Sequence, residues 1–219
     1  LVPALRRWKA GQSIKEDGPT WHMSKQGTPT MGGLMFIAAV VVVVLVLNGP
    51  AILAGDLTSG FVLLLALVFG LIGFVDDYAK IKKKENAGLT PRQKLVLQIL
   101  VAAVFILVLF LESDGLPSLM IPFTGISIDL PWPVYIIFAA FVIVGADNAV
   151  NLTDGIDGLA ASVTVPVAVF FAAVGARIGN TGVTIFAGAL AGGLLGFLIY
   201  NFNPAKVFMG DTGSLFLGG

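Results

Sequence analysis

The sequence contains no cysteine and only one histidine, His22, among its 219 residues. The absence of cysteine excludes disulfides, thiolate metal sites and cysteine nucleophiles, and a single histidine cannot form a histidine metal cluster by itself. Any metal that the chain binds must therefore rely on oxygen ligands.

Charged residues are also scarce. They make up 12% of the chain, hydrophobic residues make up 57%, and the mean hydropathy is +0.94. Soluble domains contain about one half apolar and one quarter charged residues, so this composition predicts a membrane protein. The formal net charge is zero, which provides no global basic field for nucleic acid, and we expect no nucleic-acid partner.

Long apolar runs are abundant, and each is long enough, or nearly so, to cross a bilayer as a helix of about 20 residues. They cover residues 31–47, 57–75, 95–111, 132–146, 159–176 and 183–200. They are continuously apolar rather than alternating, which favours helices over barrel strands. We expect an all-α fold, a polytopic transmembrane helix bundle with six spans and the start of a seventh at 215–217.

We expect residues 1–219 to form a single integral-membrane catalytic domain. The chain starts at Leu1 rather than at methionine, and it stops at Gly219 just after a new apolar run has begun. These two ends predict a fragment that is truncated on both sides.

The basic residues predict the orientation, because lysine and arginine are retained in short cytoplasmic loops. Twelve of the thirteen lie in the first, third and last connecting segments, and Arg177 alone lies in an opposite loop. The twelve are Arg6, Arg7, Lys9, Lys15, Lys25, Lys80, Lys82, Lys83, Lys84, Arg92, Lys94 and Lys206. We therefore expect the first segment and the segments after the second, fourth and sixth spans to be cytoplasmic.

Aspartates gather in three of the segments that are expected to be cytoplasmic. Asp76 and Asp77 follow the second span, Asp154 and Asp157 follow the fourth, and Asp211 follows the sixth. Carboxylates on loops suit Mg²⁺, which takes one or two of them together with substrate phosphates. Nearby lysines can neutralise phosphate charge while the metal polarises a phosphoryl oxygen. Together these residues predict a phosphate-handling site.

Each motif also has a simpler interpretation. The Asp76–Asp77 pair could merely end a helix at the membrane boundary. The segment 151–158 could be a turn followed by a helix N-cap, because Asp and Gly are common there. The basic run 80–84 could serve only as a topology signal or contact anionic lipids. Lys25 precedes a loop that contains Pro29 and three glycines, whose backbone can approach a ligand closely.

The combined motifs resemble those of the polyprenyl-phosphate N-acetylhexosamine-1-phosphate transferases, and the resemblance covers essentially the whole chain in the same order. The motifs are Lys25-Gln-Gly-Thr-Pro-Thr-Met-Gly-Gly33, Gly73-Phe-Val-Asp-Asp-Tyr78, Asn148-Ala-Val-Asn-Leu-Thr-Asp-Gly-Ile-Asp-Gly-Leu159 and 201–214. The first and third favour the branch that acts on UDP-MurNAc-pentapeptide over relatives that act on other UDP-amino sugars.

The resemblance implies transfer of phospho-MurNAc-pentapeptide from UDP to undecaprenyl phosphate, which yields lipid I and UMP in peptidoglycan synthesis at the bacterial inner membrane. It implies Mg²⁺ held by Asp211, with Asp76 and Asp77 beside the reacting phosphates and one of them activating the lipid phosphate. Lys25, Lys80 and Lys94 would contact phosphate or order the site. The nucleotide and metal surroundings would be formed by Asn151, Asp154, Gly155, Asp157, Asn201 and Phe208, with Phe208 a candidate for stacking on uracil.

The resemblance also implies about ten spans in complete members of the family, each long enough to cross the bilayer, a late histidine-rich cytoplasmic loop, and a possible homodimer. Two reaction routes remain open, namely direct attack by the lipid phosphate and a covalent intermediate on Asp76 or Asp77. Two other functions also remain open. A transporter would require polar groups near the middle of its spans, and a lipid-binding scaffold would need no catalysis.

Overall fold

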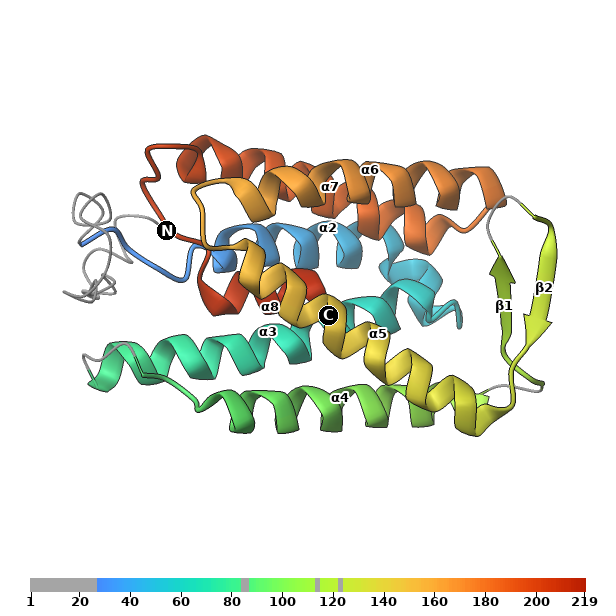
Figure 1. Cartoon of the computed structure of the whole chain (residues 1–219). Coiled ribbons are helices and arrows are strands. Elements are labelled where there is room, and N and C mark those ends of the chain that lie inside the picture. The colour runs from blue at the N-terminus through green and yellow to red at the C-terminus, as the bar shows by residue number, and fades with distance from the viewer. Residues whose placement is uncertain (1–26, 84–86, 113–114, 122–123) are drawn as a thin grey trace.

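The computed structural model describes residues 27–83, 87–112, 115–121 and 124–219. Within these ranges the chain forms a helical bundle with one small hairpin (Figure 1). The helices are α2 (Gly33–Leu53), α3 (Thr58–Lys83), α4 (Pro91–Glu112), α5 (Trp132–Thr153), α6 (Leu159–Ile178), α7 (Thr181–Asn201) and α8 (Gly210–Gly218). The strands β1 (Ser118–Ile121) and β2 (Ile126–Asp129) lie between α4 and α5.

Six of these helices, α2 to α7, are long and apolar enough to span a membrane. They coincide with the six apolar runs in the sequence, and they confirm the expected polytopic helix bundle. The chain is a multi-pass membrane protein. The antiparallel β1–β2 hairpin is a small addition to the expected all-α fold, and its register pairs Ser118 with Asp129.

Asp154 and Asp157 lie in the loop between α5 and α6, as expected. The loops expected at Asp76, Asp77 and Asn151 are wrong, because the helices continue beyond the apolar runs. Helix α3 extends past Val75 to Lys83, and α5 extends past Ala146 to Thr153. Asp76, Asp77 and Asn151 therefore lie on the last helical turns. Polar residues can extend a helix where it leaves the hydrocarbon layer, and hydropathy alone does not detect such turns.

Helix α8 is the short element that organises one end of the bundle. It starts at the same end as the last turns of α3, α5 and α7, and it runs inward between α3 and α5 (Figure 1). We call this the aspartate end, because Asp77 and Asp211 lie there. The β1–β2 hairpin lies at the opposite end (Figure 1).

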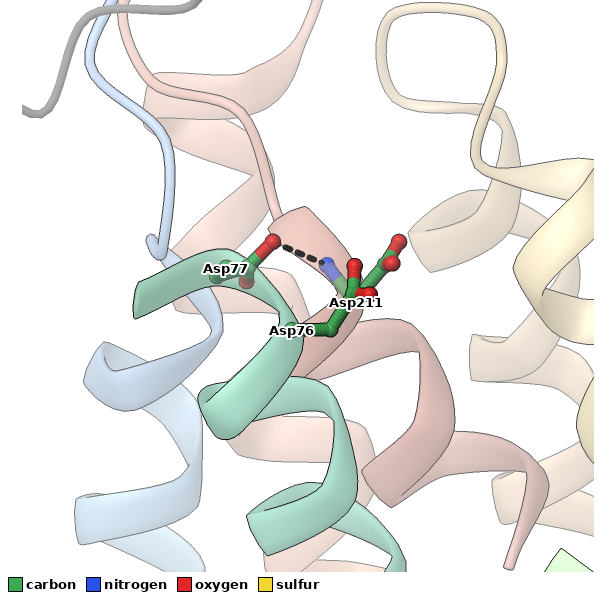
Figure 2. Close-up of side chains that lie close together, drawn as sticks. All are labelled: Asp76, Asp77 and Asp211. Atoms are coloured by element: carbon green, nitrogen blue, oxygen red, sulfur yellow. Dashed lines mark hydrogen bonds between the residues drawn. The ribbon is translucent and has the colours of Figure 1, made fainter. Parts of the chain in front are cut away.

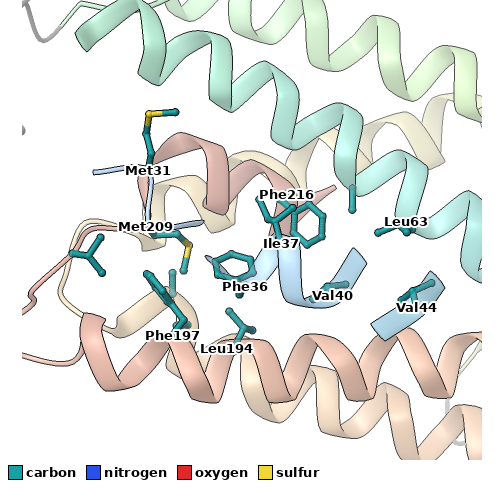
Figure 3. Close-up of a cluster of buried hydrophobic side chains, with 14 residues drawn as sticks. Met31, Phe36, Ile37, Val40, Val44, Leu63, Leu194, Phe197, Met209 and Phe216 are labelled. Carbon is teal, nitrogen blue, oxygen red and sulfur yellow. The ribbon is translucent and has the colours of Figure 1, made fainter. Parts of the chain in front are cut away.

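The core between α2, α7 and α8 is built around three aromatic rings (Figure 3). Phe36 makes edge-to-face contacts with Phe197 at a centroid distance of 5.4 Å and with Phe216 at 6.0 Å. All three rings are at most 2% exposed. This arrangement fixes α8 against α2, and it thereby fixes the position of Asp211 in the first turn of α8.

Near the hairpin end, a buried polar contact joins α2 to α3. Asn48 Nδ2 donates to Ser59 Oγ at 2.6 Å, and both side chains are at most 1% exposed. A hydrogen bond between buried side chains satisfies groups that neither lipid nor water reaches. This contact stabilises the bundle far from the aspartate end.

Candidate functional site

Three carboxylates meet at the aspartate end, although more than 130 residues separate Asp77 from Asp211 (Figure 2). Asp76 and Asp77 lie on α3, and Asp211 lies in the first turn of α8. One oxygen from each of the three lies within 4.8 Å of the others. Asp76 and Asp77 are buried, whereas Asp211 is 18% exposed. The cluster thus has one open side, at Asp211.

Glycines permit this approach of α8 to its neighbours. A Cβ atom on Gly73 of α3 would overlap the backbone carbonyl of Asp211, and a Cβ on Gly33 of α2 would overlap Gly213. Gly210 adopts a φ of +75°, which favours glycine, directly before Asp211. The glycines therefore determine where Asp211 can lie.

Two lysines neutralise most of the negative charge. Lys80 Nζ lies 2.6 Å from Asp76 Oδ2 and 2.9 Å from Asp211 Oδ2, and it lies 3.8 Å from the nearer oxygen of Asp77. Lys94 Nζ, from the start of α4, lies 2.6 Å from Asp211 Oδ2 and 3.5 Å from Asp76 Oδ2. Three carboxylates and two ammonium groups form one network, which can exchange partners when a phosphate or a cation enters.

Asn151 binds the other oxygen of Asp211. Its Nδ2 donates to Asp211 Oδ1 at 2.9 Å and to Ser214 Oγ at 2.8 Å. Asp211 therefore accepts from α3, α4 and α5 at once, through Lys80, Lys94 and Asn151. It is the centre of the site.

Burial and charge act in opposite directions on Asp211. Burial alone would raise the pKa of Asp211, but contact with the Asp76 carboxyl group and the positive charges of Lys80 and Lys94 lower it below its usual value. Asp211 is therefore ionised at neutral pH, which suits a metal ligand.

Asp154 has the opposite environment. Burial raises its pKa to about 8, and the negative charges of Asp211, Asp77 and Asp157 add to this rise. The Asp154 carboxyl group is therefore largely protonated at neutral pH. In that form it can donate a hydrogen bond to a phosphate oxygen.

Asp77 caps α8 from the side of another helix. Its Oδ1 accepts from the Asp211 backbone N–H at 3.2 Å, and its Oδ2 accepts from the Thr212 N–H at 2.9 Å and the Thr212 hydroxyl at 2.7 Å. The first N–H groups of a helix lack partners within it and favour a negative group. Asp77 thus orients α8, and both of its oxygens are already in use.

Replacing Asp77 with Ala is expected to destabilise the protein by about 2 kcal/mol, because two N–H groups and a buried hydroxyl lose their acceptor. Thermal unfolding of the purified protein in detergent measures this loss. Asp56 is a matched control, since its Oδ1 accepts from the Thr58 N–H at 3.2 Å in an exposed position. Asp56→Ala should cost less, and equal losses from the two variants would contradict the special role of the Asp77 cap.

Asp76 is held differently from Asp77. Its Oδ1 accepts from the Leu89 N–H at 2.7 Å, while Oδ2 has no directed hydrogen bond among the described residues and forms only ion pairs with the two lysines. A Cβ on Gly88 would lie 2.5 Å from Asp76 Oδ1. Within the carboxylate cluster, Asp76 Oδ2 is therefore the buried oxygen that is held by ion pairs alone.

The other residues that were predicted around the nucleotide take different positions. Asn151 contacts Asp211 directly, whereas three others brace the segment between α7 and α8. Asp157 Oδ2 accepts from the Ala205 N–H at 3.1 Å, and Asn201 accepts from the Gly158 N–H at 3.1 Å and donates to the Val207 carbonyl at 3.0 Å. Phe208 exchanges backbone hydrogen bonds with Pro29 and Gly32 at 2.8 Å. Gly155 is exposed and contacts none of them closely.

The loop before α2 is only partly described. Lys25 lies outside the described residues, so the structure does not place this predicted phosphate contact. The following residues pair with the segment that leads into α8, through the Gly32 and Gly33 N–H groups, which donate to the Phe208 and Met209 carbonyls. The loop therefore lies beside the entry to α8.

Four further residues lie at or below the site and were not predicted from the sequence. Thr212 and Ser214 lie on the first turns of α8, and Gln98 and Asp147 lie on α4 and α5. Helical spacing was the available signal, because Ser214 follows Asp211 by three residues and Gln98 follows Lys94 by four. Asp147 could have been noted as an acid at the end of an apolar run.

The donor set fits a hard divalent cation. Three carboxylates converge, Asp211 is ionised and partly open, and the buried Asp76 Oδ2 lacks a directed partner. Oxygen ligands of this type suit Mg²⁺, and the two lysines can turn to substrate phosphates when a cation binds. Asp211 and Asp76 are the residues that would hold it.

Comparisons with known proteins agree with this chemistry. Residues 59–219 match the family model described as glycosyl transferase family 4, and residues 25–37 match signature 1 of the phospho-N-acetylmuramoyl-pentapeptide-transferases. A protein of that name from Staphylococcus carnosus (strain TM300) is 48% identical over 223 aligned residues, which cover 100% of this chain and 68% of the relative. Proteins of the same name from Staphylococcus aureus strains JH9 and Newman match with the same identity and coverage.

Proposed function

This chain belongs to the phospho-N-acetylmuramoyl-pentapeptide-transferases of glycosyl transferase family 4, and from that membership we propose the reaction that it catalyses. It transfers phospho-MurNAc-pentapeptide from its UDP carrier to undecaprenyl phosphate, and it releases UMP. The single observation that carries the proposal is the convergence of Asp76, Asp77 and Asp211 with Lys80 and Lys94 at one end of a membrane-spanning bundle.

The position of this network fits a reaction between a water-soluble donor and a lipid acceptor. The polar side chains lie on the last turns of α3 and α5 and the first turns of α4 and α8. Figure 1 shows that these helix termini lie at the same end of the bundle. A phosphate attached to a polyprenyl chain lies at the same depth, since its tail stays in the hydrocarbon layer. We place this end at the cytoplasmic face of the bacterial inner membrane, on the basis of the basic residues in these segments.

The bond changes balance without a further reactant. An oxygen of the carrier phosphate forms a bond to the sugar-linked phosphorus, the bond from that phosphorus to the bridging oxygen breaks, and UMP leaves with that oxygen and its charge. Phosphoryl transfer of this kind needs alignment and charge stabilisation more than covalent help from the protein.

The residues of the network divide this work. Lys80 and Lys94, which contact Asp211 before substrate binds, would turn to the phosphates and offset their charge. Asp211 and Asp76 would hold Mg²⁺, which when bound polarises a phosphoryl oxygen and neutralises the leaving group. Asn151 would keep Asp211 oriented through its hydrogen bond to Oδ1.

The remaining predicted residues surround the nucleotide in this proposal. Lys25 would add a phosphate contact. Asp154, Gly155 and Asp157 would line the approach to Asp211, and Asn201 would brace the segment that carries Phe208, the candidate for stacking on uracil.

Direct attack by the lipid phosphate is favoured over a covalent intermediate, because most carboxylate oxygens of Asp76 and Asp77 already accept hydrogen bonds from the protein. Both Asp77 oxygens cap α8, and Asp76 Oδ1 accepts from the Leu89 N–H. A nucleophilic carboxylate would need a free oxygen aimed at phosphorus. Only Asp76 Oδ2 lacks a directed hydrogen bond among these four oxygens, and it lies between two lysines.

The proposed function is tested with the full-length protein in detergent or liposomes, supplied with UDP-MurNAc-pentapeptide, undecaprenyl phosphate and Mg²⁺. We expect UMP release that requires all three components and yields one lipid-linked product per UMP. Ion flux across liposomes without UMP release would instead indicate a transporter. UMP release without the lipid acceptor, together with a phosphorylated protein, would show the covalent route.

A further inference from the structure

A second polar layer lies one helical turn below the site, between α4 and α5. Gln98 Nε2 donates to Asp147 Oδ2 at 2.6 Å, and Asn148 Nδ2 donates to Gln98 Oε1 at 2.8 Å. Gln98 and Asp147 are both 0% exposed. The proposed reaction uses none of these three side chains.

The donors and acceptors in this layer can be assigned in only one way. Asn148 Nδ2 also donates to the Val144 carbonyl at 2.8 Å, which fixes its amide group as a donor toward Gln98. The Gln98 oxygen must then face Asn148, so its NH₂ group must face Asp147. Position 147 therefore requires a hydrogen-bond acceptor.

This layer is connected to the site through two helices. Gln98 follows Lys94 by one turn on α4, and Asp147 precedes Asn151 by one turn on α5. Lys94 and Asn151 each bind a different oxygen of Asp211, at 2.6 Å and 2.9 Å. The Gln98–Asp147 hydrogen bond thus joins α4 and α5, which supply the Lys94 and Asn151 side chains that bind the two oxygens of Asp211.

Helix α8 closes the layer from a third side. A Cβ atom on Gly218 would overlap the Cα atom of Asp147 and would lie 2.9 Å from its Oδ1. Asp147 Oδ1 itself has no hydrogen-bond partner among the described residues. Among the described residues, Asp147 therefore acts through Oδ2 alone, which accepts from Gln98.

We propose that Asp147 is a positioning residue of the transferase site, which acts as the acceptor for Gln98 and thereby keeps Lys94 and Asn151 on Asp211. This inference rests on the proposed function. The required chemistry is acceptance at Oδ2 rather than negative charge, because a carboxyl group and an amide group both offer an acceptor oxygen.

Three variants of the full-length enzyme test this role. Asp147→Asn keeps the acceptor, Asp147→Leu removes it with the same number of side-chain heavy atoms, and Gln98→Leu removes the donor. We expect Asp147→Asn to retain kcat within about twofold and the pH profile of the wild type. Asp147→Leu and Gln98→Leu should each lower kcat about tenfold with little change in the KM for the UDP substrate, because a misplaced Lys94 affects the reacting state more than the bound one. The double variant Asp147→Leu/Gln98→Leu should lose no more kcat than the worse of its two single variants, because both changes break the same hydrogen bond.

The buried contact between Asn48 and Ser59 provides a matched control, because it also joins two helices but lies far from the site. Asn48→Leu should lower the unfolding temperature and leave kcat per folded enzyme unchanged. The proposal is overturned if Asp147→Asn loses as much kcat as Asp147→Leu, if Asp147→Leu retains wild-type kcat, if the two losses add, or if Asn48→Leu lowers kcat equally.

A structural readout separates this inference from the proposed function. Val96 of α4 and Leu152 of α5 are exposed, and each can be replaced with a cysteine that carries a spin label in an otherwise cysteine-free protein. The two labels report the distance between α4 and α5. We expect one narrow distribution in the wild type, Asp147→Asn and Asn48→Leu, and a broader one in Asp147→Leu. Unchanged distances in Asp147→Leu would overturn the positioning role. Absence of UMP release by the wild type would defeat the proposed function alone.

Discussion

Replacing Asp211 with Asn is expected to lower turnover by at least about a hundredfold, which is the loss seen when one group that stabilises transition-state charge is removed. Asp211 is the centre of the site, with Lys80 and Lys94 on Oδ2 and Asn151 on Oδ1. Asparagine keeps the volume and one acceptor oxygen, but it lacks the charge that pairs with the lysines and holds a hard cation. UMP release at saturating substrate, measured over a range of Mg²⁺ concentrations, gives the result.

A matched control for this change is Asp129→Asn, because Asp129 is an exposed acid on β2 at the opposite end of the bundle. It should leave turnover and the Mg²⁺ dependence unchanged. If Asp211→Asn keeps more than about a third of wild-type turnover, a difference of less than about 1 kcal/mol in the barrier, Asp211 is not the principal metal ligand. The control also shows whether loss of any carboxylate changes the behaviour of the protein in detergent.

The sequence was sufficient for the spans and for the grouping of the aspartates, because both depend on local signals. Continuous apolar runs predict the six long helices, and the basic residues place Asp76, Asn151 and Asp211 in segments on one side. The structure brings these three residues together with Lys80 and Lys94. The resemblance to known motifs added the reaction, which spacing alone does not provide.

The division of labour between Asp76 and Asp77 could not be read from the sequence. The two residues are adjacent and chemically identical, yet Asp77 caps α8 and Asp76 faces the lysines. Which side of α3 faces α8 depends on the packing of helices that are distant in the chain. For the same reason the acceptor role of Asp147 became visible only with Gln98 in place.

The helix boundaries were underestimated for a different reason. A hydropathy window ends where charge begins, whereas backbone hydrogen bonds continue into the interface. The last turns of α3 therefore carry Asp76, Asp77 and Lys80 on a rigid element. This rigidity matters for function, because side chains on a helix hold their spacing better than those on a loop.

The glycine contacts between α3 and α8 give the second large expected effect. Replacing Gly73 with Ala is expected to lower turnover by about a hundredfold, because the new Cβ atom would overlap the Asp211 carbonyl and would lie 2.7 Å from the Thr212 nitrogen. The overlapping atoms belong to the backbone of α8, which cannot relieve the overlap by a change of rotamer, so the whole helix must shift. A shift of about 1 Å at a catalytic group can lower turnover about a hundredfold. Turnover per folded enzyme, with the folded fraction taken from gel filtration, measures the effect.

Gly→Ala at two other helical positions completes a graded series. Each change raises helix propensity by the same amount, so the variants differ only in the contact that the new Cβ atom makes. Gly145→Ala on α5 introduces a Cβ with no neighbour within 4 Å, so it should stabilise its helix by about 1 kcal/mol and leave turnover unchanged. Gly70→Ala on α3 places its Cβ 3.2 Å from the Phe216 Cβ, so α8 must yield by a few tenths of an ångström and turnover should fall only a fewfold. The loss should therefore increase from Gly145 to Gly70 to Gly73. If Gly73→Ala instead resembles Gly145→Ala, the close approach of α8 to α3 does not determine where Asp211 lies.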